Sequence, residues 1–107
     1  MEVHRTLGFG FLEVVYKDAI EIETNEVEIP YEREKCFEIY YKNEKLARHF
    51  YADFFMFNKI ITEIKTSAKG ISNEYVAQTL NYMKASNTKL GLIINFGYTL
   101  EFKRIIL

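Results

Sequence analysis

The hydrophobic and polar positions of this chain follow two different periods. Between positions 11 and 24, directly after the glycine turn GFG, apolar residues recur at steps of three and four, which predicts an amphipathic helix. The segment NEYVAQTLNYMKAS at 73–86 has the same spacing, and Ser72 or Asn73 is a suitable N-cap for it. Most of the remaining chain is alternating or continuously apolar, as is typical of strands.

The strand pattern predicts a mixed sheet. The expected strands lie at about 34–41, 46–56, 60–66, 89–98 and 99–107, with the turn KNEK after the first and the loop SAKGIS after the third. The resulting order is α-β-β-β-α-β-β, an α/β class with a central sheet flanked by helices. With 107 residues and no repeat or linker, we expect one domain over 1–107.

Composition narrows the function classes. The hydrophobic content of 49% excludes a disordered chain, and the net charge of −1 does not indicate a nucleic-acid binder. A nucleic acid or another polyanion could therefore bind only through a local basic patch or a bound metal. Cys36 is the only cysteine, so we expect a reducing cytoplasm and a small core residue at this position. No apolar run or leader predicts a membrane span or a secretory signal.

Charged residues interrupt the apolar stretch YADFFMFNKIITEIKT at 51–66. Strand alternation puts Glu63 and Lys65 on one face, and Asp53 on the neighbouring strand could join them. Two carboxylates and a backbone carbonyl form a hard oxygen cage suited to Mg²⁺ or Mn²⁺, and a nearby lysine can steer water or stabilise a phosphate. The alternative is an ordinary Glu–Lys pair on a solvated strand. The spacing Glu-x-Lys, taken alone, more often has this structural explanation.

The connection between the two strands decides whether such a cage can exist. The common two-residue turn would point Asp53 away from Glu63. A three-residue connection at 57–59 pairs Met56 with Ile60 instead and places Asp53 opposite Glu63. A β-bulge between Asp53 and Met56 would have the same effect. The metal-site hypothesis therefore predicts an odd loop or a bulge here.

Four short motifs together resemble a known family. The motifs are G-x-x-E-x-x-Y (Gly10, Glu13, Tyr16), an aspartate at Asp53, the triplet Glu63-Ile64-Lys65, and Q-x-x-x-Y (Gln78, Tyr82). The aspartate and the triplet are similar to the PD-(D/E)XK nuclease signature, with Ala52 in place of its proline, and the last motif is similar to that of RecB-type nucleases. Over nearly its whole length the chain resembles the GxxExxY family, a branch of the PD-(D/E)XK superfamily.

This resemblance implies a restriction-endonuclease-like fold and metal-dependent hydrolysis of phosphodiester bonds. Asp53, Glu63 and the Ile64 carbonyl would hold Mg²⁺ or Mn²⁺, and Lys65 would orient water or stabilise the phosphate. Glu13 would be an auxiliary acid. The pair Gln78 and Tyr82 would support the site and the substrate.

Two further questions stay open at this point. The nuclease hypothesis predicts nucleic acid as the partner, with DNA favoured over RNA, and is compatible with a homodimer. The alternative is a non-catalytic nucleic-acid or protein-binding module on a nuclease scaffold, which suits a mildly acidic domain. His4 is either a metal ligand, as in some RecB-type sites, or a solvated terminal histidine, and we favour the latter because a lone histidine is a weak ligand signal.

Overall fold

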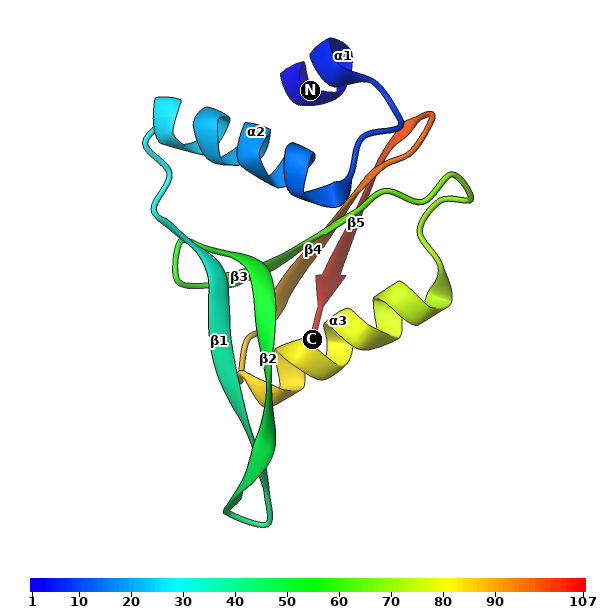
Figure 1. Ribbon diagram of the computed structural model, residues 1–107. Helices are drawn as coiled ribbons and strands as arrows, with labels where there is room; N and C mark the ends of the chain where they lie inside the picture. Colours follow the sequence, from blue (N-terminus) through cyan, green and yellow to red (C-terminus); the bar gives the residue numbers. More distant parts are fainter.

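The computed structural model describes residues 1–107 and contains three helices and one five-stranded sheet (Figure 1). In chain order the elements are α1 (Glu2–Leu7), α2 (Glu13–Glu26), β1 (Tyr31–Tyr41), β2 (Glu44–Met56), β3 (Ile60–Lys65), α3 (Asn73–Ala85), β4 (Leu90–Phe96) and β5 (Leu100–Ile106). The predicted order from α2 onward is confirmed. Helix α1 was not predicted, because its six residues are too few to display a helical period. None of the helices has the length and apolar character needed to cross a membrane.

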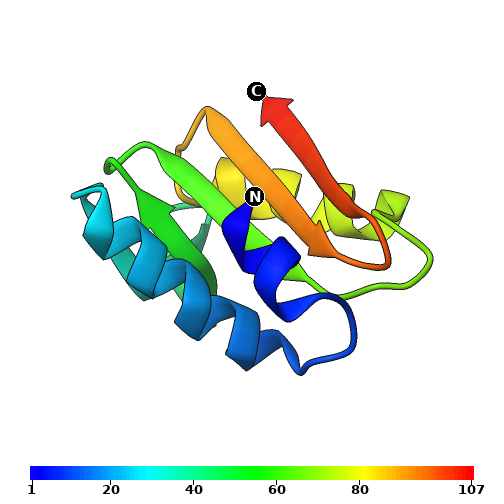
Figure 2. The same ribbon diagram turned by 90° about the horizontal axis from the view of Figure 1, so that it is seen from above.

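The strands lie side by side in the order β1-β2-β3-β4-β5. Neighbours are antiparallel except β3 and β4, which are parallel and are joined through α3. Figure 2 shows α1 and α2 on one face of the sheet and α3 on the other. The α/β expectation of a mixed central sheet flanked by helices is therefore confirmed.

Each face of the sheet has its own hydrophobic cluster. On the α2 face the buried members are Val3, Tyr16, Ile20, Phe54, Ile64, Ile94 and Phe96. On the α3 face they are Ala52, Ile61, Met83, Ile93 and Ile105. Of the two predicted N-cap candidates for α3, Ser72 is the cap: its hydroxyl accepts the Tyr75 N–H at 3.2 Å.

Strands β1 and β2 form a long hairpin that extends past the rest of the sheet (Figure 1). Its tip residues Lys42 and Asn43 have φ values of 48° and 65°, in keeping with a hairpin turn that needs left-handed backbone. Cys36 lies exposed on this hairpin, so its expected place in the core is wrong. The neighbouring residue Phe37 takes the buried side instead and packs against the α3 cluster.

The turn between β2 and β3 has the three-residue form, one of the two arrangements that the metal-site hypothesis allowed. Met56 pairs with Ile60, and Phe57 and Asn58 both adopt left-handed backbone, with φ values of 56° and 54°. The Lys59 N–H closes the turn on the Met56 carbonyl at 3.0 Å. The predicted three-residue connection, with Met56 paired to Ile60, is thus confirmed.

His4 contributes to the attachment of α1. Its Nε2 lies 3.0 Å from the Gly97 carbonyl oxygen, and its ring lies 6.1 Å from that of Phe96. The favoured expectation of a solvated terminal histidine is therefore wrong. Because α1 buries Val3 on the sheet, it carries the following histidine to the turn between β4 and β5.

Gly91 allows α3 to lie close against β4, and this generates a stability prediction. A Cβ at this position would lie 2.6 Å from Met83 Sδ and 3.2 Å from Thr79 Cγ2. Because both side chains belong to a packed interior, Gly91→Ala should lower the free energy of unfolding by about 1–3 kcal/mol, measured by urea denaturation. In a Met83→Ala background the same change should cost clearly less. Equal costs in both backgrounds would contradict this packing argument.

Candidate active site

Asp53 and Glu63 lie where β2 separates from β3. The antiparallel pairing of these strands ends at Phe54 and Thr62. Beyond that point side chains replace the backbone ladder: Glu63 Oε2 accepts the Asp53 N–H at 2.8 Å, and Asp53 Oδ2 accepts the Ile64 N–H at 2.7 Å. Each carboxylate therefore bonds to the other's strand, and the two acids share one gap in the sheet.

The backbone of β2 and of the neighbouring β1 is irregular beside Asp53. Phe54 packs in the α2 cluster whereas Ala52 packs in the α3 cluster, so β2 changes sides around Asp53. On β1, Arg33 pairs with Phe54 and Lys35 pairs with Ala52, so the residue level with Asp53 is Glu34. Glu34 has a φ of 53° although it lies within a strand. Left-handed backbone in a strand is costly for a non-glycine residue and is found preferentially at functional sites.

Burial and the neighbouring charge of Asp53 perturb Glu63 and Glu13. Glu63 is only 3% exposed, and its burial, followed by the charge of Asp53, raises its pKa from 4.5 to about 8. Burial, followed by the charge of Asp53, also raises the pKa of Glu13. Lys65 opposes both shifts, which places its ammonium near the two glutamates. Without a bound cation, Glu63 therefore keeps its proton to a higher pH than an ordinary glutamate does.

Helix α3 supplies the partners of Lys65. The Lys65 ammonium donates to Gln78 Oε1 at 3.3 Å and lies 4.9 Å from the centre of the Tyr75 ring. Gln78 Nε2 in turn donates to the Tyr82 hydroxyl at 3.1 Å. The Tyr82 ring stacks on Phe50 at 4.1 Å, which anchors this chain of contacts on β2.

The G-x-x-E-x-x-Y segment has a structural explanation. Tyr16 is fully buried; its hydroxyl donates to the Gly8 carbonyl at 2.6 Å and accepts the Phe11 N–H at 3.3 Å. Gly10 has a φ of 118°, which a side chain would strain. These contacts fix the loop before α2, so Glu13 becomes the first residue of the helix, where a carboxylate is favoured by the helix dipole.

Sequence reasoning missed two residues of the site. Lys17 Nζ lies 3.0 Å from Asp53 Oδ1 and also forms an ion pair with Glu34. A signal was available for Lys17, because it lies four residues after Glu13 and so shares its helix face. No comparable signal marked Glu34, whose position depends on the local strand geometry.

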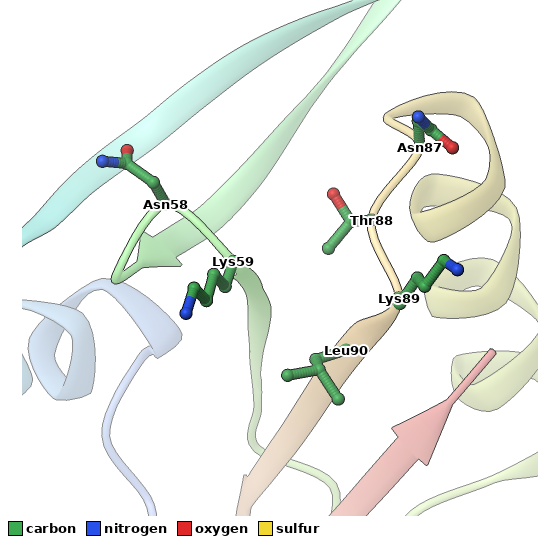
Figure 3. A pocket seen from close by; sticks show the side chains of 6 residues that line it. All are labelled: Asn58, Lys59, Asn87, Thr88, Lys89 and Leu90. Atoms are coloured by element: carbon green, nitrogen blue, oxygen red, sulfur yellow. The ribbon is translucent and has the colours of Figure 1, made fainter.

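The surface hollows of the molecule lie elsewhere. None of the three is lined by Asp53, Glu63 or Lys65. One hollow, with a volume of about 270 Å³, lies between the turn before β3 and the turn before β4. Figure 3 shows Lys59 and Lys89 among its lining residues. This hollow lies at the beginning of the parallel strands, whereas Lys65 ends β3. We therefore define the candidate site by its chemistry, at the place where β2 and β3 stop pairing.

The raised pKa of Glu63 predicts a pH-dependent stability. The folded protein keeps a proton at pH values between 4.5 and about 8 that the unfolded chain releases, so the stabilisation is complete at low pH and is lost as pH rises through this window. Glu63→Gln keeps an acceptor for the Asp53 N–H and removes the charge. It should stabilise the metal-free protein on the order of 2 kcal/mol more near pH 9 than near pH 4.

Thermal unfolding at both pH values measures this difference. Glu44→Gln, at the exposed hairpin tip, is the matched control and should show no such pH dependence. A Glu63→Gln effect that is the same at both pH values would show that folding does not shift the pKa of Glu63.

Comparison with known proteins agrees with this architecture. No curated protein matches the chain at a significant level. A solved structure described as "Crystal structure of SSO0001" is similar, with a TM-score of 0.68 and 19% identity over 88% of this chain and 50% of that one. The chain thus spans about half the length of that neighbour and shares with it a restriction-endonuclease-like fold. The family model described as the PD-(D/E)XK nuclease superfamily matches residues 1–105, and the chain belongs to this superfamily.

Proposed function

We propose that the protein is a metal-dependent nuclease that hydrolyses phosphodiester bonds in nucleic acid, with DNA as the favoured substrate. The observation that supports this most is the paired burial of Asp53 and Glu63 beside Lys65. Burial and the charge of Asp53 raise the pKa of Glu63, so these two acids are costly together in a sheet unless a cation compensates them. The motif of Gly10, Glu13 and Tyr16 supports a finer assignment to the GxxExxY branch.

The donor set fits a small divalent cation. No group of three or more His, Cys, Asp or Glu side chains is arranged to hold a metal, so a third protein ligand would have to come from the backbone. The N–H and the carbonyl of one strand residue face the same neighbouring strand. Since the Ile64 N–H bonds to Asp53, the Ile64 carbonyl faces the same gap. We therefore assign Asp53, Glu63 and the Ile64 carbonyl as the ligands of Mg²⁺ or Mn²⁺.

The residues around this gap would divide the chemical work. Bound Mg²⁺ or Mn²⁺ would supply a water of lowered pKa and neutralise charge on the scissile phosphate. Lys65 would donate to the attacking water or to a phosphate oxygen, and its contacts with Gln78 and Tyr75 hold it in place for this. Glu13, at the start of α2, would be an auxiliary acid close to Asp53.

A second candidate is a non-catalytic nucleic-acid or protein-binding module. The observation that favours it is that both oxygens of Asp53 already have partners, Lys17 and the Ile64 N–H. A scaffold that had lost its metal would be stabilised by such an internal ion pair. The two candidates differ in whether any nucleic acid is cut.

Cleavage of nucleic acid separates the two candidates. Single- and double-stranded DNA and RNA are incubated with Mg²⁺ or Mn²⁺, and we expect at least DNA to be cut. Lys65→Met should lower the rate of cleavage about a hundredfold or more, because it removes one electrostatic stabiliser of the transition state. Lys89→Met removes a lysine at the other end of the sheet and should leave the rate unchanged.

Chelation with EDTA should abolish the activity, and added Mn²⁺ should restore it. If every substrate stays intact with both metals, the binding module is the better account. Activity that persists in EDTA would contradict the metal-dependent mechanism.

A further inference from the structure

Lys17 is a buried cation that no part of the proposed hydrolysis uses. Its side chain is only 10% exposed, and its ammonium lies 3.0 Å from Asp53 Oδ1. A lysine is rarely buried to this extent unless it is paired. The other Asp53 oxygen accepts the Ile64 N–H at 2.7 Å, so the orientation of Asp53 does not depend on the lysine alone.

The position of Lys17 conflicts with a divalent cation on Asp53. An ammonium next to the same carboxylate repels the ion and competes for its negative charge, and this repulsion is strong where water is largely excluded. The lysine must therefore weaken its contact with Asp53 when a cation binds, and it needs another partner because an unpaired buried charge is costly.

Glu34 is that second partner. It lies on β1, level with Asp53 on β2, and forms an ion pair with Lys17. The Glu34 side chain is 48% exposed, so its carboxylate is less confined than that of Asp53, whose side chain is 13% exposed. The φ of 53° at Glu34 shows that the strand adopts costly backbone at this residue.

We propose that Lys17 is the resident counter-ion of Asp53 and that Glu34 takes over the lysine when a divalent cation binds. Lys17 is then a positioning residue that competes with the cation, and Glu34 relieves the competition. The pair sets the metal affinity of the site without touching the substrate. This inference rests on the proposed metal site of Asp53 and Glu63.

The two residues should act on metal affinity in opposite directions. Calorimetric titration with Mn²⁺ should show about tenfold or tighter binding for Lys17→Met, because the competing charge is gone. Glu34→Gln should weaken binding, since Lys17 then has only Asp53 as a partner. Glu34→Gln should also weaken binding by more in the wild-type background than in the Lys17→Met background, because its effect acts through the lysine.

Matched variants control for folding and for general charge effects. Lys45 and Glu38 form an ion pair at 2.9 Å on the same hairpin, further from Asp53, so Lys45→Met and Glu38→Gln should leave the affinity unchanged. Circular dichroism verifies that each variant folds. If Lys17→Met does not fold, Lys17→Gln is used in its place. Glu34→Gln leaves the ion pair between Lys17 and Asp53 intact, so this variant does not leave the buried lysine unpaired.

The outcomes separate this inference from the proposed function. Asp53→Asn should abolish Mn²⁺ binding, which places the ion at Asp53. If it does so but Lys17→Met binds no more tightly than wild type, the counter-ion role is wrong and the metal site stands. Equal effects of Glu34→Gln in both backgrounds would overturn the role of Glu34. If the wild-type protein binds no Mn²⁺, or binds it equally after Asp53→Asn, the metal site fails and the inference fails with it.

Discussion

The structure depends on the crossed hydrogen bonds between Asp53 and the strand that carries Glu63. Where the ladder between β2 and β3 ends, each acid satisfies a backbone N–H of the opposite strand, which the separation would otherwise leave without a partner. The two carboxylates are thus held close together although their charges repel. This constraint has a cost, visible in the raised pKa of Glu63, which a cation bound between the two acids would lower.

The other elements can be understood as supports for this gap. The buried Tyr16 fixes the glycine turn so that α2 begins at Glu13 and brings Lys17 to Asp53. On the opposite face, Gln78 of α3 holds Lys65, and Gly91 lets this helix lie close against β4. Two helices from opposite faces therefore converge on one opening in the sheet, each through a lysine that it positions.

Much of this arrangement could be predicted from the sequence, because it depends on the spacing of apolar residues and on whether the turn after β2 has an odd or an even number of residues. Helical spacing and strand alternation predicted the element order from α2 onward. The metal-site hypothesis required either an odd connection or a β-bulge, and the three-residue connection that pairs Met56 with Ile60 is present. The counter-ion pair could not be predicted, since Glu34 reaches Lys17 from a left-handed strand residue that no local pattern marks. Cys36 was misplaced because strand alternation turns its neighbour Phe37 toward the α3 cluster and leaves Cys36 on the exposed face of β1.

The central claim is that Asp53, Glu63 and the Ile64 carbonyl bind a divalent cation, and paramagnetic NMR tests it most directly. Substoichiometric Mn²⁺ added to ¹⁵N-labelled protein broadens amide signals near the ion. The account predicts that the amides of Asp53, Glu63 and Ile64 broaden first, while that of Lys89, in the hollow at the other end of the sheet, stays sharp. Broadening centred elsewhere, or none at these three amides, would contradict the claim.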